Sequence, residues 1–136
     1  MKPKSDEVRG TPIGPLRHEL IGRLLRVEEL LRDKGYLTPV RPAFLRIHAD
    51  VKSMHWGRLN GQYRVVLLIR SPEDEKKYQR VALNDLNVTV SMLVAATNAL
   101  RDLIHHMRNA REALRCATKD AIAKVEAIGD QLEGEE

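Results

Sequence analysis

Basic and aromatic side chains alternate in the middle of this 136-residue chain. Between residues 41 and 70 a single acidic residue, Asp50, stands against Arg41, Arg46, Lys52, Arg58, Arg64 and Arg70. The aromatic and histidine side chains among them are Phe44, His48, His55, Trp56 and Tyr63. Basic groups neutralise phosphates and exposed aromatic rings stack on bases. This segment therefore predicts contacts with nucleic acid, or with an acidic protein that the same basic surface would attract.

Residues that hold metals or act as nucleophiles are poorly spaced for that chemistry. His18-Glu19 begins like a zinc-protease helix motif, but Gly22 stands where the second histidine belongs. His105 and His106 are adjacent and so diverge on a helix, and the lone Cys116 allows no thiolate cluster. The chain is therefore predicted to have no metal, no cofactor and no catalytic activity.

The elements around the basic segment are predicted from periodicity. Residues 45–52 alternate apolar and polar, which is typical of a half-buried strand. Asn60-Gly61 then separates two β-prone runs and predicts a type I′ hairpin turn, which would pair Leu59 with Gln62, and Trp56 with Val65. Trp56 and Tyr63 fall on the apolar face of this hairpin, so a place in the core is the alternative to base stacking. The run Val65–Ile69 is apolar on both faces, as in a central strand or in a strand covered by a partner.

The N-terminal part divides into an arm and a helix. Residues 1–14 are rich in Pro, Gly and charge and are predicted to be an extended arm. Residues 15–34 have helical spacing of Leu, Ile and Val, with Pro15 as first residue and Gly35 as C-terminal cap. The charged side chains Arg17, Arg23, Arg26, Glu28 and Arg32 are assigned to the side of this helix away from the core.

One long amphipathic helix is predicted over residues 72–132. Ser71 and Pro72 form a helix-start signal. Apolar residues recur at every seventh position from Leu86 onward: Leu86, Leu93, Leu100, Met107, Leu114, Ala121 and Ile128. A polar stripe runs in step with them from Lys77 to Glu133. An alternative remains, because Leu86–Met92 alternates like a strand and Asn84-Asp85 could join it in a hairpin to residues 78–83.

Such a helix would be about 90 Å long, and the rest of the chain is too small to cover its apolar stripe. We therefore predict that the stripe contacts a partner, either another copy of the chain or a larger complex. The expected interface residues are Leu86, Leu93, Leu100, Ile104, Met107, Leu114 and Ile128. Two alternatives place the stripe inside a monomer: a helix folded back near Asn98 or Asn109, and a stripe that is simply the core face of the domain.

The sequence thus predicts an α+β protein: an N-terminal helix, an antiparallel β-hairpin sheet and a very long C-terminal helix, in one domain over residues 15–136. No apolar run is long enough to span a membrane, the N-terminus lacks a classical secretion signal, and a single cysteine suits a reducing compartment. We expect a cytoplasmic, non-catalytic assembly subunit, or one within a cytoplasmically assembled particle. The alternative function is a nucleic-acid-binding accessory protein that uses the basic hairpin.

Overall fold

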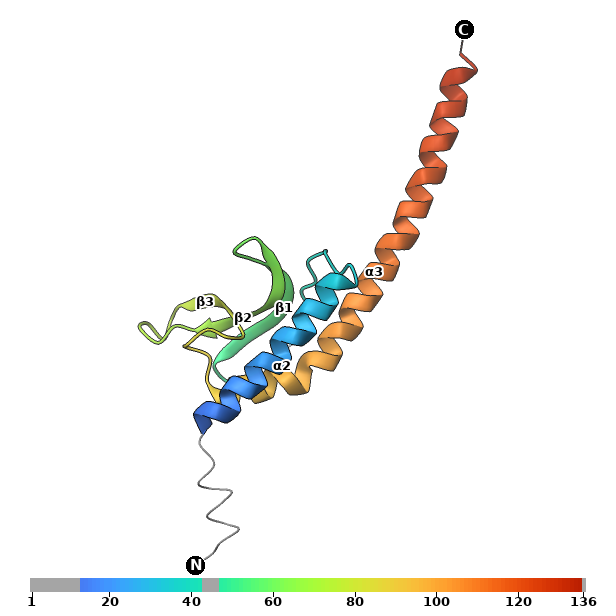
Figure 1. The fold of residues 1–136 in the computed structure, drawn as a ribbon. Coiled ribbons are helices and arrows are strands. Elements are labelled where there is room, and N and C mark those ends of the chain that lie inside the picture. Colours follow the sequence, from blue (N-terminus) through green and yellow to red (C-terminus); the bar gives the residue numbers. More distant parts are fainter. Residues whose placement is uncertain (1–12, 43–46, 136) are drawn as a thin grey trace, which may run out of the picture.

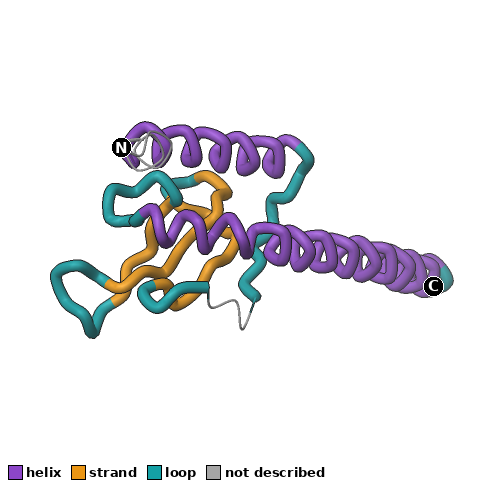
Figure 2. Tube along the Cα trace, turned by 90° about the horizontal axis from the view of Figure 1, so that it is seen from below, coloured by secondary structure: helices purple, strands orange, loops and turns teal. Residues whose placement is uncertain are grey.

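The computed structural model describes residues 13–42 and 47–135 and has the predicted α+β architecture. Its elements are helix α2 (Ile13–Asp33), strands β1 (Val51–Leu59), β2 (Gln62–Arg70) and β3 (Tyr78–Ala82), and helix α3 (Val90–Glu133). The strands form an antiparallel sheet in the order β1–β2–β3. Helices α2 and α3 lie together against the sheet, and the second half of α3 extends far beyond it (Figure 1; Figure 2).

The hairpin of β1 and β2 has the predicted turn and register. Asn60 and Gly61 both have positive φ angles, 53° and 81°, as a type I′ turn requires. Leu59 pairs with Gln62, and Trp56 with Val65. Strand β2 lies between β1 and β3, as predicted for a central strand, and Val65, Val66, Leu67 and Ile69 of its apolar run are buried.

The strand predicted at residues 45–52 is largely wrong. Strand β1 begins only at Val51 and continues without interruption to the turn at Asn60. His48 makes an isolated bridge to Val51, and residues 43–46 lie outside the described part. Among the described residues of the predicted strand, a turn from His48 to Val51 therefore replaces the part before β1. The segment before it contributes instead through Val40, which exchanges two backbone hydrogen bonds with Trp56 at the outer edge of β1 (2.8 and 2.9 Å).

The N-terminal helix is confirmed with a small shift. It begins at Ile13, so the last two residues of the predicted arm are helical, and residues 1–12 of that arm lie outside the described part.

The predicted start of the long helix at Pro72 is wrong, because residues 71–77 form a turn into β3. Ser71 Oγ accepts a hydrogen bond from the Glu73 amide and Asp74 Oδ1 accepts one from the Lys76 amide. The same side-chain chemistry caps helices and closes turns, so the local signal was ambiguous. Helix α3 instead begins at Val90, after Thr89, whose side chain accepts a hydrogen bond from the Met92 amide. The alternative prediction, a hairpin of residues 78–83 and 86–92, was right about its first strand, which is β3. It was wrong about its second strand, because residues 86–92 form a loop and the start of α3.

The core lies between the sheet and the two helices. Its largest fully buried side chains include Trp56, Met54, Leu67, Leu93 and Met107. The indole of Trp56 also donates a hydrogen bond to the Tyr36 backbone oxygen (2.9 Å). Trp56 is therefore a core residue and offers no exposed ring for base stacking.

Helix α3 divides into two parts at about residue 110. Met107 is its last fully buried side chain, Ala110 is half-buried, and Arg111 lies over the Tyr36 ring at 4.6 Å from the centroid. We call residues 13–42 and 47–110 the body and residues 111–133 the projecting segment. No side chain of the projecting segment is buried among the described residues.

Two glycines give a matched test of backbone conformation. Gly61→Ala should lower the free energy of unfolding by about 1–2 kcal/mol, because an L residue is strained at its φ of 81°. Gly22→Ala should raise it by about 0.5–1 kcal/mol, because Gly22 lies inside α2 and an added Cβ would have nothing within 4 Å. Urea unfolding followed by Trp56 fluorescence measures both. Equal effects of the two substitutions would contradict the turn assignment.

Candidate functional site

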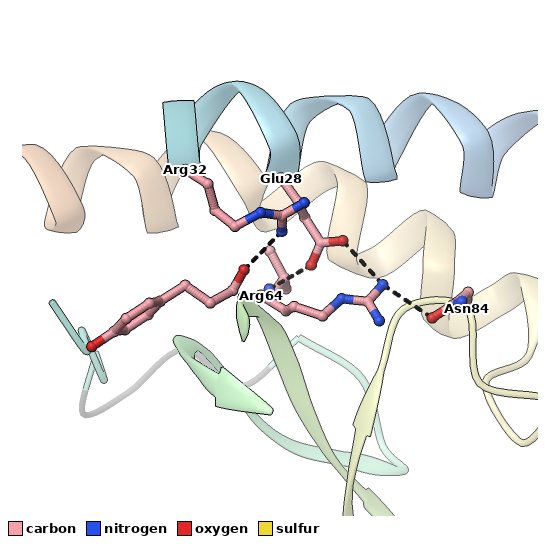
Figure 3. Close-up of polar contacts among 6 residues, drawn as sticks. Glu28, Arg32, Arg64 and Asn84 are labelled. Carbon is pink, nitrogen blue, oxygen red and sulfur yellow. Dashed lines mark hydrogen bonds and ion pairs between the residues drawn. The ribbon is translucent and has the colours of Figure 1, made fainter. Parts of the chain in front are cut away.

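A buried carboxylate joins α2 to the sheet. Glu28 is 1% exposed, and its two oxygens accept hydrogen bonds from different groups (Figure 3). Oε2 accepts from the Val65 amide at 2.6 Å, and Oε1 accepts from the Arg64 guanidinium at 3.3 Å. Arg64 is 18% exposed and also donates to Asn84 Oδ1 at 3.1 Å. The carboxylate therefore links one helix, one strand and the loop after β3.

This cluster completes an edge of the sheet that no strand covers. Strand β3 ends at Ala82, opposite Val66, so β2 has no strand neighbour at Val65 and Tyr63 on that side. Glu28 accepts the Val65 amide proton, and Arg32, one turn later on α2, donates to the Tyr63 carbonyl at 2.8 Å. Side chains of a helix thus satisfy backbone groups that a longer β3 would have paired.

Electrostatics at Glu28 reflect two opposing effects. Burial raises the pKa of Glu28, and the Arg64 charge and the Val65 amide oppose this rise. A buried carboxylate is costly unless it is paired and hydrogen-bonded, and here both oxygens are.

An open depression of about 440 Å³ lies beside the cluster, and three arginines contribute to its lining. Each of them already has a partner. Arg26 pairs with Glu29 at 3.0 Å, Arg64 pairs with Glu28, and Arg32 donates to the Tyr63 carbonyl. The arrangement is that of a structural clamp between helix and sheet, with its cations already engaged.

The prediction that Glu28 lies on the outer side of its helix was wrong. A signal for the correct placement was present, because Ile21, Leu24, Glu28 and Leu31 follow one helical stripe, and all four are buried. A charged residue within an apolar stripe indicates a buried partner, which here is Arg64 on a different element.

The predicted nucleic-acid residues do not form one free basic surface. Arg64 is bound to Glu28, and Arg70 contacts Asp50 and the Glu75 carbonyl. Arg58 lies over the Tyr63 ring. Arg41 is exposed, and Arg46 lies outside the described residues.

The aromatic ring of Tyr78, on β3, is also engaged by basic side chains of its own chain. Lys52 and Arg70 both lie over this ring, at 5.2 and 5.6 Å from its centroid. A ring already contacted by two cations of its own chain is a poor platform for a base.

His55 is buried without a hydrogen bond from any described residue. It is 4% exposed, and neither ring nitrogen has a partner in the described part of the chain. Burial lowers the pKa of His55 to about 4, with smaller contributions from Arg41 and Arg80. Its ring lies against Gly57, where an added Cβ would come within 3.2 Å of it. The imidazole is therefore neutral near pH 7 and fills space on the sheet face opposite Trp56.

The other reactive residues lie on the outer surface of α3. Cys116 is exposed, with its Sγ 3.8 Å from Glu112 Oε1. His105 and His106 meet edge to face with ring centroids 6.2 Å apart. Within residues 13–42 and 47–135, no group of three or more His, Cys, Asp or Glu is arranged to hold a metal ion.

The predicted interface residues fall into three environments. Leu93 and Met107 are fully buried in the core of the chain itself, so a partner cannot reach them. Leu100 and Ile104 are half-buried against that core. Leu86 is not helical and lies in the loop before α3, 92% exposed.

Leu114 and Ile128 are the predicted interface residues that lie on the projecting segment. Their side chains are 51% and 55% exposed, respectively. Ile122, Val125 and Leu132, which were not among the predicted interface residues, are exposed there to a similar degree. The structure thus concentrates the uncovered apolar side chains of the stripe beyond the body.

The clamp at Glu28 predicts a large stability difference between neighbouring glutamates. Glu28→Ala should lower the free energy of unfolding by about 3–5 kcal/mol, since it leaves Arg64 and the Val65 amide without their acceptor. Glu29→Ala removes an exposed pair with Arg26 and should cost less than about 1 kcal/mol. Urea unfolding measures both. Similar losses for the two variants would show that the buried cluster does not hold α2.

The low pKa of His55 predicts a loss of stability in acid. Between about pH 6.5 and pH 4 the unfolded chain binds a proton at His55 and the folded chain does not, so the free energy of unfolding falls as the pH decreases. His55→Phe should remove this contribution, and the exposed His105→Gln should retain it. Urea unfolding at pH 7, 6, 5 and 4 compares the slopes. Parallel curves for wild type and His55→Phe would contradict a neutral buried ring.

No family model, no curated protein and no solved structure matches this chain. Within the part of the chain that the structure describes, no helix has the length and apolar character to cross a membrane. The projecting segment carries five large apolar side chains that are more than half exposed: Leu114, Ile122, Val125, Ile128 and Leu132.

Proposed function

We propose that this chain is a non-catalytic assembly subunit and that its projecting segment joins it to other chains. The observation that carries the proposal is a helix whose first half packs in the body and whose second half, beyond the contact of Arg111 with Tyr36, has no side chain buried by any described residue (Figure 1). The projecting segment has 23 residues and so a length of about 35 Å.

The projecting segment keeps the amphipathic pattern of the buried half. Its seven-residue repeat places Arg111 and then six uncharged residues along one edge, which we call the apolar edge: Leu114, Thr118, Ala121, Val125, Ile128 and Leu132. Charged residues such as Lys119, Glu126 and Asp130 lie away from this edge. Apolar residues spaced 3 and 4 apart are the pattern with which helices pair in coiled coils and bundles.

Energetics favour covering this edge. Its four large apolar side chains, Leu114, Val125, Ile128 and Leu132, are 51–66% exposed. Complete burial of such a side chain is worth about 1.5–3 kcal/mol, so covering the exposed part of each supplies roughly half of that amount. Helices in proteins also gain most of their stability from packing an apolar face, which this segment lacks within its own chain.

The polar residues of the body support a structural role for the rest of the molecule. Glu28, Arg32 and Arg64 hold α2 to the sheet, and Arg17 donates to the carbonyls of Asp85 and Val88 before α3. These contacts fix the direction in which α3 leaves the body. The body would then serve as a rigid base that presents the projecting segment to a partner. The free thiol of Cys116 suits assembly in the reducing cytoplasm.

The proposal predicts that charges on the apolar edge prevent association. The wild-type chain should have a mass in solution above the 15.5 kDa of one chain, and Val125→Asp/Ile128→Asp should return it to that mass. Aspartate at these positions would have to be buried without a partner in any helix pair. Light scattering after size exclusion measures the mass over a range of concentrations.

Ala123→Asp is the matched control, because Ala123 lies on the opposite side of the same helix and should leave the mass unchanged. Circular dichroism checks that all variants remain folded. A wild-type chain that stays at one chain mass at every concentration contradicts the proposal.

A further inference from the structure

The distribution of charge and apolar residues along the projecting segment indicates which partner fits it. We propose that the partner is a second copy of this chain, bound antiparallel through residues 111–135, with Leu114 of each copy opposite Leu132 of the other. This inference rests on the proposed assembly function and adds the identity, orientation and register of the partner.

Charge favours the antiparallel orientation. Residues 111–124 contain four basic and two acidic residues, whereas residues 125–136 contain five acidic residues and no basic one. In an antiparallel pair, the acidic end of each helix lies beside the basic beginning of the other. In a parallel pair, the two acidic ends lie together and repel each other.

The apolar edge has the symmetry that antiparallel pairing needs. When the two helices cross with residue 123 at the centre of the overlap, Leu114 faces Leu132, Thr118 faces Ile128 and Ala121 faces Val125. Each of these layers then occurs twice in the pair, because the second copy supplies the same residues in reverse order. A small residue meets a larger one in the Ala121 and Thr118 layers, which suits close packing.

Residues at the ends and centre of this overlap agree with the same register. Arg111 falls on the apolar edge, where a charge opposes a parallel pair because it would face Arg111 of the second copy. In the antiparallel register Arg111 lies instead at the level of residues 133–135 of the second copy, where α3 ends and Glu133 and Glu135 are acidic. Ile122, which is 54% exposed beside the edge, comes next to Ile122 of the second copy at the centre. Lys124 also lies near this centre, beside Lys124 of the second copy. This contact between like charges is at the outer margin of the pair.

The body limits the register from one side. An overlap longer by one heptad would place Leu132 against Met107, which is fully buried in the core of its own chain. An overlap shorter by one heptad would leave Leu114 opposite no residue of α3. The proposed register is therefore the one that covers every exposed apolar layer of the projecting segment and requires no change in the body.

Cysteine cross-linking tests orientation and register together. In a Cys116→Ser background, one chain carries Leu114→Cys and a second, distinguishable by a longer tag, carries Leu132→Cys. A disulfide needs Cα atoms within about 7 Å, whereas identical positions 114 in an antiparallel pair are about 27 Å apart. After the chains are mixed and allowed to exchange, the antiparallel pair should form a disulfide between the two different chains, and neither chain should cross-link to itself.

The outcomes distinguish a failure of this inference from a failure of the proposed function, because the mass of the wild-type chain in solution is measured alongside the cross-links. Mixed Ala123→Cys and Leu132→Cys chains are the matched control and should not cross-link, because position 123 faces away from the partner. Self-linked Leu114→Cys chains would show a parallel pair and overturn the inference. An associated wild type with no cross-link in either arrangement overturns it too, and leaves the assembly function standing. A wild type of one chain mass overturns both.

Discussion

The structure depends on the way one carboxylate is buried. Glu28 accepts the Val65 amide proton at the point where β3 has ended, and its second oxygen holds Arg64. Without these contacts, β2 would have an unpaired edge and α2 would have a buried charge facing the sheet. Both penalties are removed only when the helix lies in one place relative to the hairpin. A polar interaction therefore fixes an alignment that apolar packing alone would leave loosely defined.

The alignment of α2 determines how much of α3 the body can cover. Helix α2 and the sheet together form the surface against which Leu93, Leu103 and Met107 are buried. This surface ends near Tyr36, which follows α2 and lies under Arg111. Helix α3 continues for 22 more residues, to Glu133, with an unchanged repeat. The same sequence pattern thus forms part of the core in the first half of α3, and in the second half it forms a surface that no described residue covers.

The sequence correctly predicted those parts of the fold that are determined by residues close together in the chain. The Asn60-Gly61 turn determined the hairpin register, and the doubly apolar run of β2 indicated a central strand. The start of α3 was misplaced because Ser71 and Asp74 form caps in turns as readily as in helices. Lys77 and Asn84 of the predicted polar stripe only flank β3, whose structure is decided by tertiary pairing with β2. Glu28 was missed because its partners, Arg64 and Val65, are more than 35 residues away.

The projecting segment has charged residues in a definite order along its length, in addition to its exposed apolar edge. An apolar stripe alone would fit any helix of matching shape. In the proposed pair, a basic beginning and an acidic end favour a partner helix with the opposite order of charge, and the same segment reversed has that order. The body adds a second restriction, because it blocks longer overlaps at Met107. In the proposed pair, charge order favours the antiparallel orientation, the pairing of apolar layers defines the register, and the body excludes a longer overlap.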